Sequence, residues 1–359
     1  MLHTHCTREI KPICRTRRNW RSISFAVVVL LLLVVFPGQA QTLAPKESAA
    51  PGLVPKFVNV PALGGIIKTR YYEAGQGDPL LLVHGGGFAG YYSANVWSKN
   101  IPGLAMHFHV FAPDKLMSGM TDNPPDDKDY NIQGEVEHMY QFIQTMKLGK
   151  INLVGQSRGA GLAWLLAMAH PEVVKTLVLV DSATVSPPLD NANAHAELMA
   201  KCPKDRDESW KCEMRILSYG PNAMEAFPDD SFAPGIYMGN LPKSKTTMAK
   251  IRAGAGEPLS GQFEQYKESL HERLRNEVLL PMPVLLYWAK NDPQAPALKN
   301  GVAFFEILAA KQPNVRMIIV NNAGHFHFRE YPDQFNNNVT NFIDYWNHAS
   351  KATVGSKAK

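Results

Sequence analysis

A serine flanked by glycines has the residue types and the spacing that nucleophilic chemistry requires. The segment G-Q-S-R-G at residues 155–159 places Ser157 at its centre. Residues 151–154 before it are apolar and predict a buried strand, and residues 160–169 after it predict a packed helix. Strand, G-x-S-x-G and helix in this order form a turn so sharp that only small residues fit beside the serine. The turn lifts the hydroxyl above the sheet, so the pattern predicts Ser157 as a nucleophile.

A serine hydroxyl becomes reactive only when a neighbouring base takes its proton. His325 follows the last predicted strand directly, and Gly324 before it allows the loop to turn. His327 lies two residues further on and would point the same way in an extended loop, so it stays an alternative. We expect His325 to be the base.

The base in turn needs a carboxylate that fixes its tautomer and stabilises the imidazolium. Asp292 follows the predicted strand at residues 284–288, and Asp181 follows the predicted strand at residues 176–180. Both would point to the same edge of a parallel sheet. The chain order of serine, acid and histidine favours Asp292 as the orienting acid, with Asp181 as the alternative.

Attack on a carbonyl builds negative charge on its oxygen, and preorganised N–H groups must face that charge. We expect one donor to be the backbone of Arg158, the residue after the serine. The other is expected from the segment H-G-G-G at residues 84–87, where glycines allow close backbone approach. Gly86 is our choice and Gly87 the alternative. The phosphate-binding patterns built on glycine are absent from this segment, so we expect no cofactor. No cluster of His or Cys with metal-ligand spacing accompanies the cysteines, so we expect no metal.

The elements that must position these side chains follow from the apolar pattern. Continuous apolar runs separated by helical patterns predict a mostly parallel sheet covered by helices on both faces, which is a doubly wound α/β fold. Functional residues collect at the carboxyl ends of the strands in such sheets. The strands are expected at residues 66–72, 80–83, 110–112, 151–154, 176–180, 284–288 and 316–320.

Residues 187–277 interrupt this alternation and predict an inserted helical cap above the strand ends. We expect most of its aromatic residues to pack within the cap and one or two to line a pocket. The α/β core is then predicted at residues 57–186 and 278–346. Residues 41–56 are expected to be a linker and residues 347–359 a flexible tail.

The first forty residues have the order of a secretory signal. Six basic residues precede the apolar run at residues 25–36, and the small-residue segment P-G-Q-A ends at residue 40. That run is shorter than the roughly 20 residues of a membrane span, so we expect no stable span once the leader is removed. We therefore predict an exported protein, periplasmic or secreted.

The charge of the chain resides in this leader. The whole sequence has 37 Lys and Arg against 32 Asp and Glu, and the leader holds six of the basic residues but only Glu9 among the acidic ones. The remainder is therefore balanced, which gives no indication of nucleic acid or anionic membrane as a partner. Cys202 and Cys212 remain after removal of the leader. We expect them to form a disulfide in an oxidising compartment, with two free thiols as the alternative.

The motifs H-G-G-G, G-Q-S-R-G, N-D-P and A-G-H together resemble those of the α/β-hydrolase superfamily over residues 57–186 and 278–346. This resemblance implies the α/β-hydrolase fold and a serine nucleophile. The pair Trp97-Ser98 after the glycine-rich segment is similar to the meta-cleavage-product hydrolases, which split carbon–carbon bonds in ring-fission diketones. Lys99 stands where Asn often follows in that family, and Arg158 where Met is common.

These observations favour a serine hydrolase that cleaves a small carbonyl substrate of moderate apolarity through an acyl-enzyme. A carboxylic ester is the main expectation, because an export signal suits an exported carboxylesterase. Carbon–carbon bond hydrolysis of the meta-cleavage-product type is the first alternative. A catalytically silent binding protein on the same fold is the alternative of another class.

Overall fold

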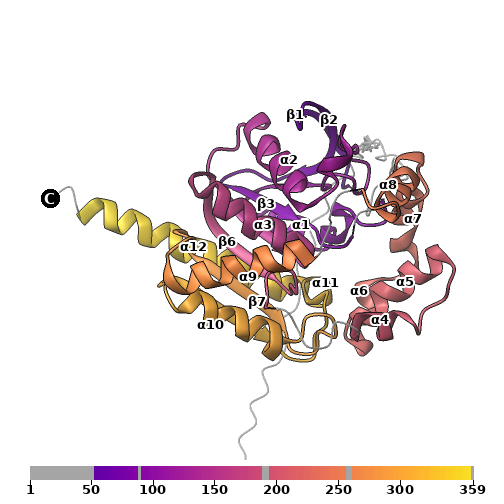
Figure 1. Ribbon diagram of the computed structural model, residues 1–359. Coiled ribbons are helices and arrows are strands. Elements are labelled where there is room, and N and C mark those ends of the chain that lie inside the picture. Colours follow the sequence, from indigo (N-terminus) through magenta and orange to yellow (C-terminus); the bar gives the residue numbers. More distant parts are fainter. Residues whose placement is uncertain (1–51, 88–89, 188–193, 256–260, 357–359) are drawn as a thin grey trace, which may run out of the picture. The chain divides into compact units, whose positions relative to one another are not determined.

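The computed structural model describes residues 52–87, 90–187, 194–255 and 261–356. The predicted signal segment at residues 1–40 lies outside these ranges, as do residues 41–51 of the predicted linker. The described residues form an eight-stranded sheet in the order β1-β2-β4-β3-β5-β6-β7-β8 (Figure 1). β1 and β2 pair antiparallel, as do β2 and β4, and the pairs from β4 to β8 are parallel. The strands are β1 (Lys56–Ala62), β2 (Gly65–Ala74), β3 (Pro79–Val83), β4 (His109–Pro113), β5 (Ile151–Gln156), β6 (Val174–Val180), β7 (Val284–Ala289) and β8 (Val315–Val320).

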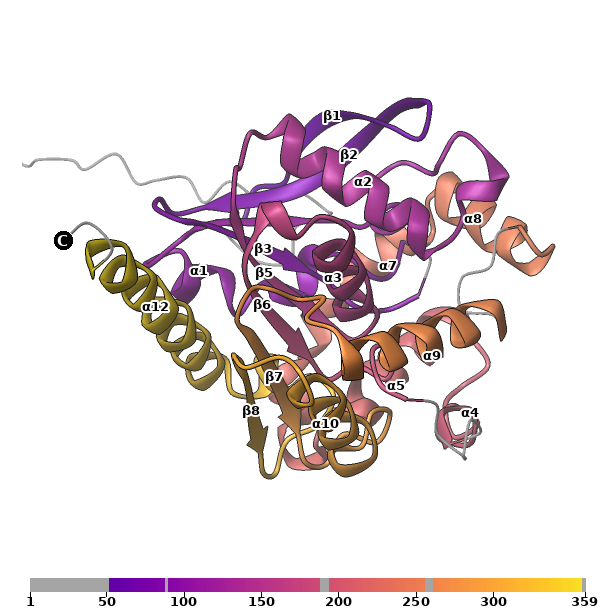
Figure 2. The same ribbon diagram turned by 60° about the vertical axis from the view of Figure 1, so that its left-hand side comes forward.

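Helices cover the sheet on both faces, which confirms the doubly wound α/β fold (Figure 2). One apolar cluster joins the sheet to α2, α3, α9 and α10, and a second joins its other face to α1 and α12. The helices are α1 (Ile101–Leu104), α2 (Ile132–Thr145), α3 (Arg158–Ala169), α4 (Ala194–Met199), α5 (Arg206–Leu217), α6 (Ala223–Ala226), α7 (Ala233–Gly239), α8 (Pro242–Arg252), α9 (Gly261–Asn276), α10 (Ala303–Ala309), α11 (His327–Glu330) and α12 (Pro332–Ser356).

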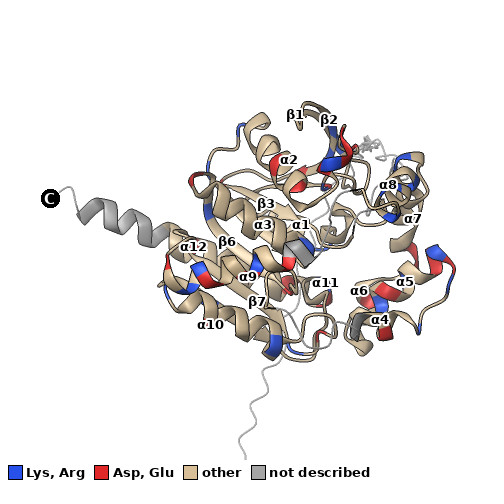
Figure 3. Ribbon diagram, viewed as in Figure 1, with Lys and Arg blue, Asp and Glu red and all other residues tan. Residues whose placement is uncertain are grey.

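The central strands read as continuous apolar runs because helices shield them on both sides. β5 and β7 are buried at every residue. Neither strand contains a charged residue, whereas Figure 3 shows both signs of charge on the helix α5. Among the described residues, no helix combines the length and apolarity that a bilayer crossing requires.

The first strand was not predicted. β1 begins at Lys56, inside the segment expected to be a linker. It forms the edge of the sheet, where several of its side chains are exposed and where a proline such as Pro61 is tolerated because an edge strand pairs on one side only. A half-exposed strand that contains proline gives only a weak apolar pattern.

The helix α9 corrects the predicted boundary of the cap. Leu270 and Leu274 of this helix are buried in the same cluster as Trp164 of α3. His271 stacks on Trp164 at 5.7 Å between ring centroids, and its Nε2 lies 2.8 Å from the carbonyl oxygen of Val185. α9 is therefore part of the helical layer of the core, and the cap consists of the helices α4 to α8.

The last helix extends into the segment that was expected to be a flexible tail. α12 continues to Ser356, whereas the flexible tail was expected from residue 347.

The cysteine prediction is confirmed, since Cys202 and Cys212 form a disulfide. Cys212 lies on α5, so the bridge ties this cap helix to the segment that precedes it.

The chain reverses its direction of travel across the sheet between β3 and β5. These two strands are parallel neighbours, with Val83 opposite Gly155. Ligands bind in open α/β sheets at such a switch point, outside the carboxyl ends of the strands. The glycine-rich segment after β3 and the serine after β5 consequently meet at one place.

Candidate active site

The serine turn has the strained geometry that its sequence predicts. Ser157 lies between β5 and α3 with φ of +53° and ψ of −124°. Its N–H donates to the carbonyl oxygen of Val180 at 2.8 Å, and its own carbonyl oxygen accepts from the hydroxyl of Ser182 at 2.6 Å. A non-glycine residue with positive φ is costly, and these bonds hold it in place.

The two glycines of the motif are required by close packing. A Cβ at Gly155 would lie 2.4 Å from the carbonyl oxygen of Gly159. A Cβ at Gly159 would lie 2.4 Å from the carbonyl oxygen of His84, at the start of the glycine-rich segment. The spacing G-x-S-x-G thus follows from the approach of α3 to the ends of β3 and β5.

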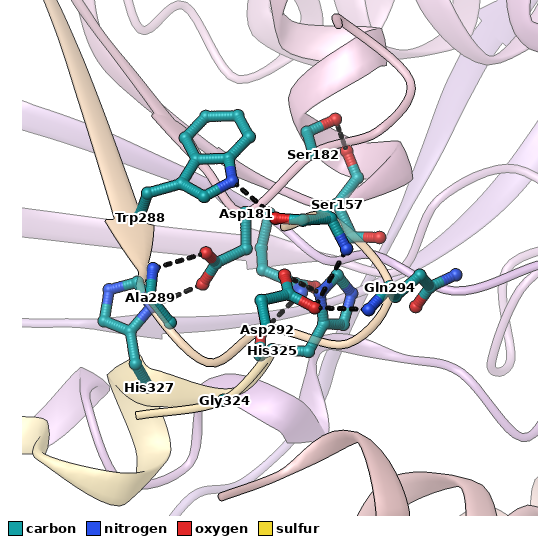
Figure 4. A network of polar contacts seen from close by, with 12 residues as sticks. Ser157, Asp181, Ser182, Trp288, Ala289, Asp292, Gln294, Gly324, His325 and His327 are labelled. Carbon is teal, nitrogen blue, oxygen red and sulfur yellow. Dashed lines mark hydrogen bonds and ion pairs between the residues drawn. The ribbon is translucent and has the colours of Figure 1, made fainter. Parts of the chain in front are cut away.

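His325 and Asp292 form a buried pair at the end of β7 (Figure 4). The Nδ1 atom of His325 lies 2.7 Å from Oδ2 of Asp292. The other carboxylate oxygen accepts the N–H groups of Gln294 and Ala295, at 2.8 and 3.0 Å. The aspartate is therefore fixed by its own loop and holds the imidazole with Nε2 available for a second contact.

Ser157 and His325 line the same cavity. Among the described residues the serine hydroxyl makes no hydrogen bond to the imidazole. Such contacts are frequently long in unliganded enzymes and tighten when substrate binds. Gln156 joins the two segments, because its Nε2 donates to the carbonyl oxygen of His325 at 3.2 Å.

The environment of His325 favours its charged form. Burial is the largest effect and opposes the charge, but the charge and hydrogen bond of Asp292 outweigh it together with the charges of Asp181 and Glu213. The pKa of His325 is consequently raised above its ordinary value. A base of this kind accepts a proton readily in the pH range around neutrality.

A second buried histidine–aspartate pair lies beside the first. Nδ1 of His327 is 2.5 Å from Oδ2 of Asp181, whose other oxygen accepts the N–H of Ala289 at 2.7 Å (Figure 4). Burial lowers the pKa of His327 to about 3 and raises that of Asp181. The alternative base His327 and the alternative acid Asp181 thus contact each other. Neither of them lines the cavity that holds Ser157.

The glycine-rich segment lies directly over the serine. A Cβ at Gly85 would lie 2.8 Å from the Cβ of Ser157. Gly86 has φ of +76°, which lets the backbone turn into the cavity. The expected donors Gly86 and Arg158, and the alternative Gly87, all line this cavity. The N–H of Arg158 belongs to the first turn of α3, where backbone N–H groups have no partner within the helix.

A buried ionic cluster supports this arrangement from behind. Nζ of Lys115 donates to the carbonyl oxygen of Gly86 at 3.2 Å and lies 3.3 Å from Oε1 of Glu135. The other oxygen of Glu135 is 3.5 Å from Nε of Arg158. Burial lowers the pKa of Lys115 to about 8, against the opposing charge of Glu135. The glycine-rich segment and the side chain of Arg158 are thereby connected through one carboxylate.

The cavity above Ser157 has a volume of about 470 Å³. Aromatic side chains from the cap form one part of its wall, namely those of Trp210, Phe227 and Phe232. Only one or two such residues were expected from the sequence. The size and lining fit a small molecule with an apolar portion.

One cation in the wall of this cavity has only neutral partners. Arg329 is 3 % exposed, and its guanidinium donates to the backbone oxygens of Ala226 and Val96 and to the hydroxyl of Ser98. Among the described residues no carboxylate pairs with it. Burial lowers the pKa of Arg329 to about 10, and its charge in turn lowers the pKa of Lys99, for which burial is the larger cause.

Neither Arg329 nor the cap residue Glu213 was predicted as a site residue from the sequence. Arg329 lies four positions after His325 and directly before Glu330, and two adjacent opposite charges gave no signal of a site residue. Glu213 lies on an amphipathic cap helix, where nothing local separates it from solvated carboxylates. Only the tertiary structure shows that both line the cavity.

Comparison with known proteins agrees with this geometry. A family model described as the alpha/beta hydrolase fold matches residues 78–208. The chain is 28% identical over 314 residues to the 2-hydroxy-6-oxo-6-(2'-aminophenyl)hexa-2,4-dienoic acid hydrolase of Metapseudomonas resinovorans, covering 85% of this chain and 95% of that protein. It is 39% identical over 123 residues to a 2-hydroxymuconate semialdehyde hydrolase of Pseudomonas sp. strain CF600, covering 34% of this chain and 43% of that protein.

Solved structures show the same fold. A serine hydrolase involved in carbazole degradation superposes with a TM-score of 0.60 and 26% identity, over 82% of this chain and 99% of that chain. A thermophilic esterase from Thermogutta terrifontis also has a TM-score of 0.60, at 18% identity, over 81% of this chain and 98% of its own. The fold and the serine site are those of an α/β-fold hydrolase, and the chain is similar to proteins of the α/β-hydrolase superfamily.

Proposed function

We propose that this protein is a carbon–carbon bond hydrolase of the meta-cleavage-product type, with Ser157, His325 and Asp292 as its catalytic triad. A relative named for hydrolysis of a ring-fission dienoic acid matches 85% of the chain, whereas the similarity to the Thermogutta terrifontis esterase, at 18% identity, shows the fold alone. This proposal replaces the ester expected from the sequence with the first alternative. Gly86 and Arg158 are proposed as the backbone donors to the oxyanion.

The reaction follows from the positions of these groups. Ser157 attacks the ketone carbon while Nε2 of His325 takes the hydroxyl proton, and the resulting oxyanion faces the two backbone N–H groups. When the carbon–carbon bond breaks, its electron pair passes to the departing carbon, which receives the proton from His325. Water then loses a proton to His325, attacks the acyl-enzyme and releases a carboxylic acid and Ser157.

A carbon leaving group departs only where its electron pair is delocalised. In a 2-hydroxy-6-oxo-dienoic acid the 2-oxo tautomer provides this delocalisation next to a carboxylate. The observation that carries the proposal is therefore Arg329, a buried cation in the cavity wall whose partners among the described residues are all neutral. A substrate carboxylate would form an ion pair with the guanidinium of Arg329. A neutral ester would leave the positive charge of this side chain uncompensated. The aromatic side chains of the cap would contact the apolar end of the substrate.

The test compares two substrate classes on purified protein. We expect kcat/KM for a ring-fission dienoate such as 2-hydroxy-6-oxo-6-phenylhexa-2,4-dienoate to exceed that for p-nitrophenyl butyrate by at least about tenfold. Efficient ester cleavage with no dienoate turnover would contradict the proposal and return the assignment to a carboxylesterase.

Replacement of Arg329 distinguishes a loss of carboxylate binding from a loss of activity toward all substrates. Arg329→Gln is expected to lower kcat/KM for the dienoate by about 30-fold or more, because a buried charge pair with the substrate is lost. Turnover of the neutral ester should fall far less, and Arg329→Lys should retain part of the dienoate activity. Arg316→Gln is the matched control, since this arginine stacks on Tyr345 at the far strand β8. Equal losses for both substrates in Arg329→Gln would count against a carboxylate contact.

We also propose that the protein is exported to the periplasm or beyond. The order of basic, apolar and small residues before residue 41 supports this, and so does the disulfide between Cys202 and Cys212, because such bridges persist in oxidising compartments. Cell fractionation with mass analysis of the product is expected to give a chain lacking about its first forty residues, with the disulfide formed. A full-length cytoplasmic chain with both thiols free would refute export.

A further inference from the structure

The glycine-rich segment over Ser157 is held from two sides. On one side Lys115 donates to the carbonyl oxygen of Gly86. On the other side the ring of Tyr92 packs so closely that a Cβ at Gly86 would lie 2.1 Å from its Cδ1 atom. A shift of this ring would therefore change the backbone at the position expected to bind the oxyanion.

The same tyrosine reaches the cap. Its hydroxyl donates to Oε2 of Glu213 at 2.6 Å, and Glu213 lies on the cap helix α5. Burial, followed by the charge of Glu213, raises the pKa of Tyr92 far above its ordinary value, so the phenol keeps its proton and remains a donor. Gly86, Tyr92 and Glu213 thus form a continuous connection from the core to α5.

The carboxyl end of α5 meets the loop of the catalytic histidine. The N–H of His325 donates to the carbonyl oxygen of Leu217, the last residue of α5, at 2.8 Å. Gly324 permits this approach, because a Cβ there would lie 2.6 Å from the same oxygen and 2.4 Å from the backbone nitrogen of Tyr219. One helix therefore contacts the glycine-rich segment through Glu213 and the histidine loop through Leu217.

We propose that Tyr92 and Glu213 are positioning residues through which the cap helix α5 sets the oxyanion-binding segment relative to His325. The cap then completes the catalytic geometry in addition to covering the cavity. The inference rests on the proposed roles of Ser157 and His325, and it does not depend on which bond the enzyme cleaves.

Two substitutions separate the mechanical connection from the charge. Tyr92→Phe keeps the ring on Gly86 but removes the link to α5. Glu213→Gln keeps an acceptor for the tyrosine hydroxyl but removes a negative charge that, with Asp292 and Asp181, raises the pKa of His325 against the effect of burial. The first should slow the reaction at every pH, and the second should move the acidic limb of the rate to lower pH.

The rate of covalent labelling of Ser157 by a fluorophosphonate is the measurement, because it requires the serine, the base and the oxyanion donors but no particular substrate. We expect Tyr92→Phe to label about tenfold more slowly on the pH plateau, a smaller loss than the 10²–10³-fold typical of deleting an oxyanion donor. The acidic limb of labelling in Glu213→Gln should be displaced to lower pH.

Tyr91→Phe is the matched control. The adjacent Tyr91 also reaches α5, where its hydroxyl contacts the carboxylate of Asp207, but its ring packs on Gly239 of the cap. Labelling of this variant should stay close to wild type. Equal slowing in Tyr91→Phe, or wild-type rates in Tyr92→Phe, would overturn the positioning role. Absence of labelling in the wild-type protein would instead refute the proposed nucleophile.

Discussion

Replacement of Ser157 by alanine is expected to lower turnover of either substrate class by about 10⁵–10⁶-fold and to abolish fluorophosphonate labelling. The hydroxyl is the atom that forms the covalent bond, and nothing else in the cavity can substitute for it at the end of β5. The thermal unfolding midpoint should hardly change, because the hydroxyl makes no hydrogen bond among the described residues. Steady-state kinetics, intact-protein mass and a thermal melt of the same preparation measure these outcomes.

Ser186→Ala is the control for Ser157→Ala. Ser186 is also a buried serine near the strand ends, but its hydroxyl donates to the carbonyl oxygen of Ser182 and does not line the cavity. This variant should lose some stability and keep its labelling. Undiminished turnover in Ser157→Ala would eliminate the proposed nucleophile, whatever the control shows.

Replacement of Asp292 by asparagine is expected to lower kcat by about 10³–10⁴-fold. Asparagine can present its amide to Nδ1 and so favour the wrong tautomer, and it no longer stabilises the imidazolium. The charge of Asp292 raises the pKa of His325, so its removal lowers that pKa. Because the base works in its neutral form, the acidic limb of kcat/KM should lie above about pH 6.5 in the wild type and move to lower pH in the variant.

Asp181→Asn is the comparison that distinguishes the two aspartates. This carboxylate contacts His327 and the N–H of Ala289, and it influences His325 only through its charge. We expect a change in kcat of less than about tenfold, a slight downward shift of the acidic limb and a loss of about 1–3 kcal/mol in the free energy of unfolding. If Asp181→Asn were the inactive variant and Asp292→Asn the active one, the acid would have to be reassigned to Asp181.

The two histidine–aspartate pairs lie close together, and for this reason the sequence kept His327 and Asp181 as alternatives to His325 and Asp292. Residues i and i+2 share a side in an extended loop, and both histidines follow the same strand. The chain leaves the extended conformation at Phe326, with ψ of 36°, and α11 begins at His327. The two imidazoles therefore diverge, one toward Asp292 at the cavity and the other toward Asp181 in the core.

The sequence by itself determined the fold class, the position of the serine turn and the set of candidate acids and bases. These features depend on local patterns: apolar runs, small residues at a sharp turn and polar residues directly after strands. The disulfide was likewise indicated by the two cysteines left after the leader. Such patterns can be recognised without knowing which residues pack against them.

The tertiary structure alone decided the pairing of the histidines, the place of α9 in the core and the composition of the cavity wall. Arg329 and Glu213 come from segments that are more than one hundred residues apart in the chain. Their meeting beside Ser157 depends on how α5 docks and where α11 begins. These are long-range packing events, and no pattern within either segment specifies the partner that it will contact.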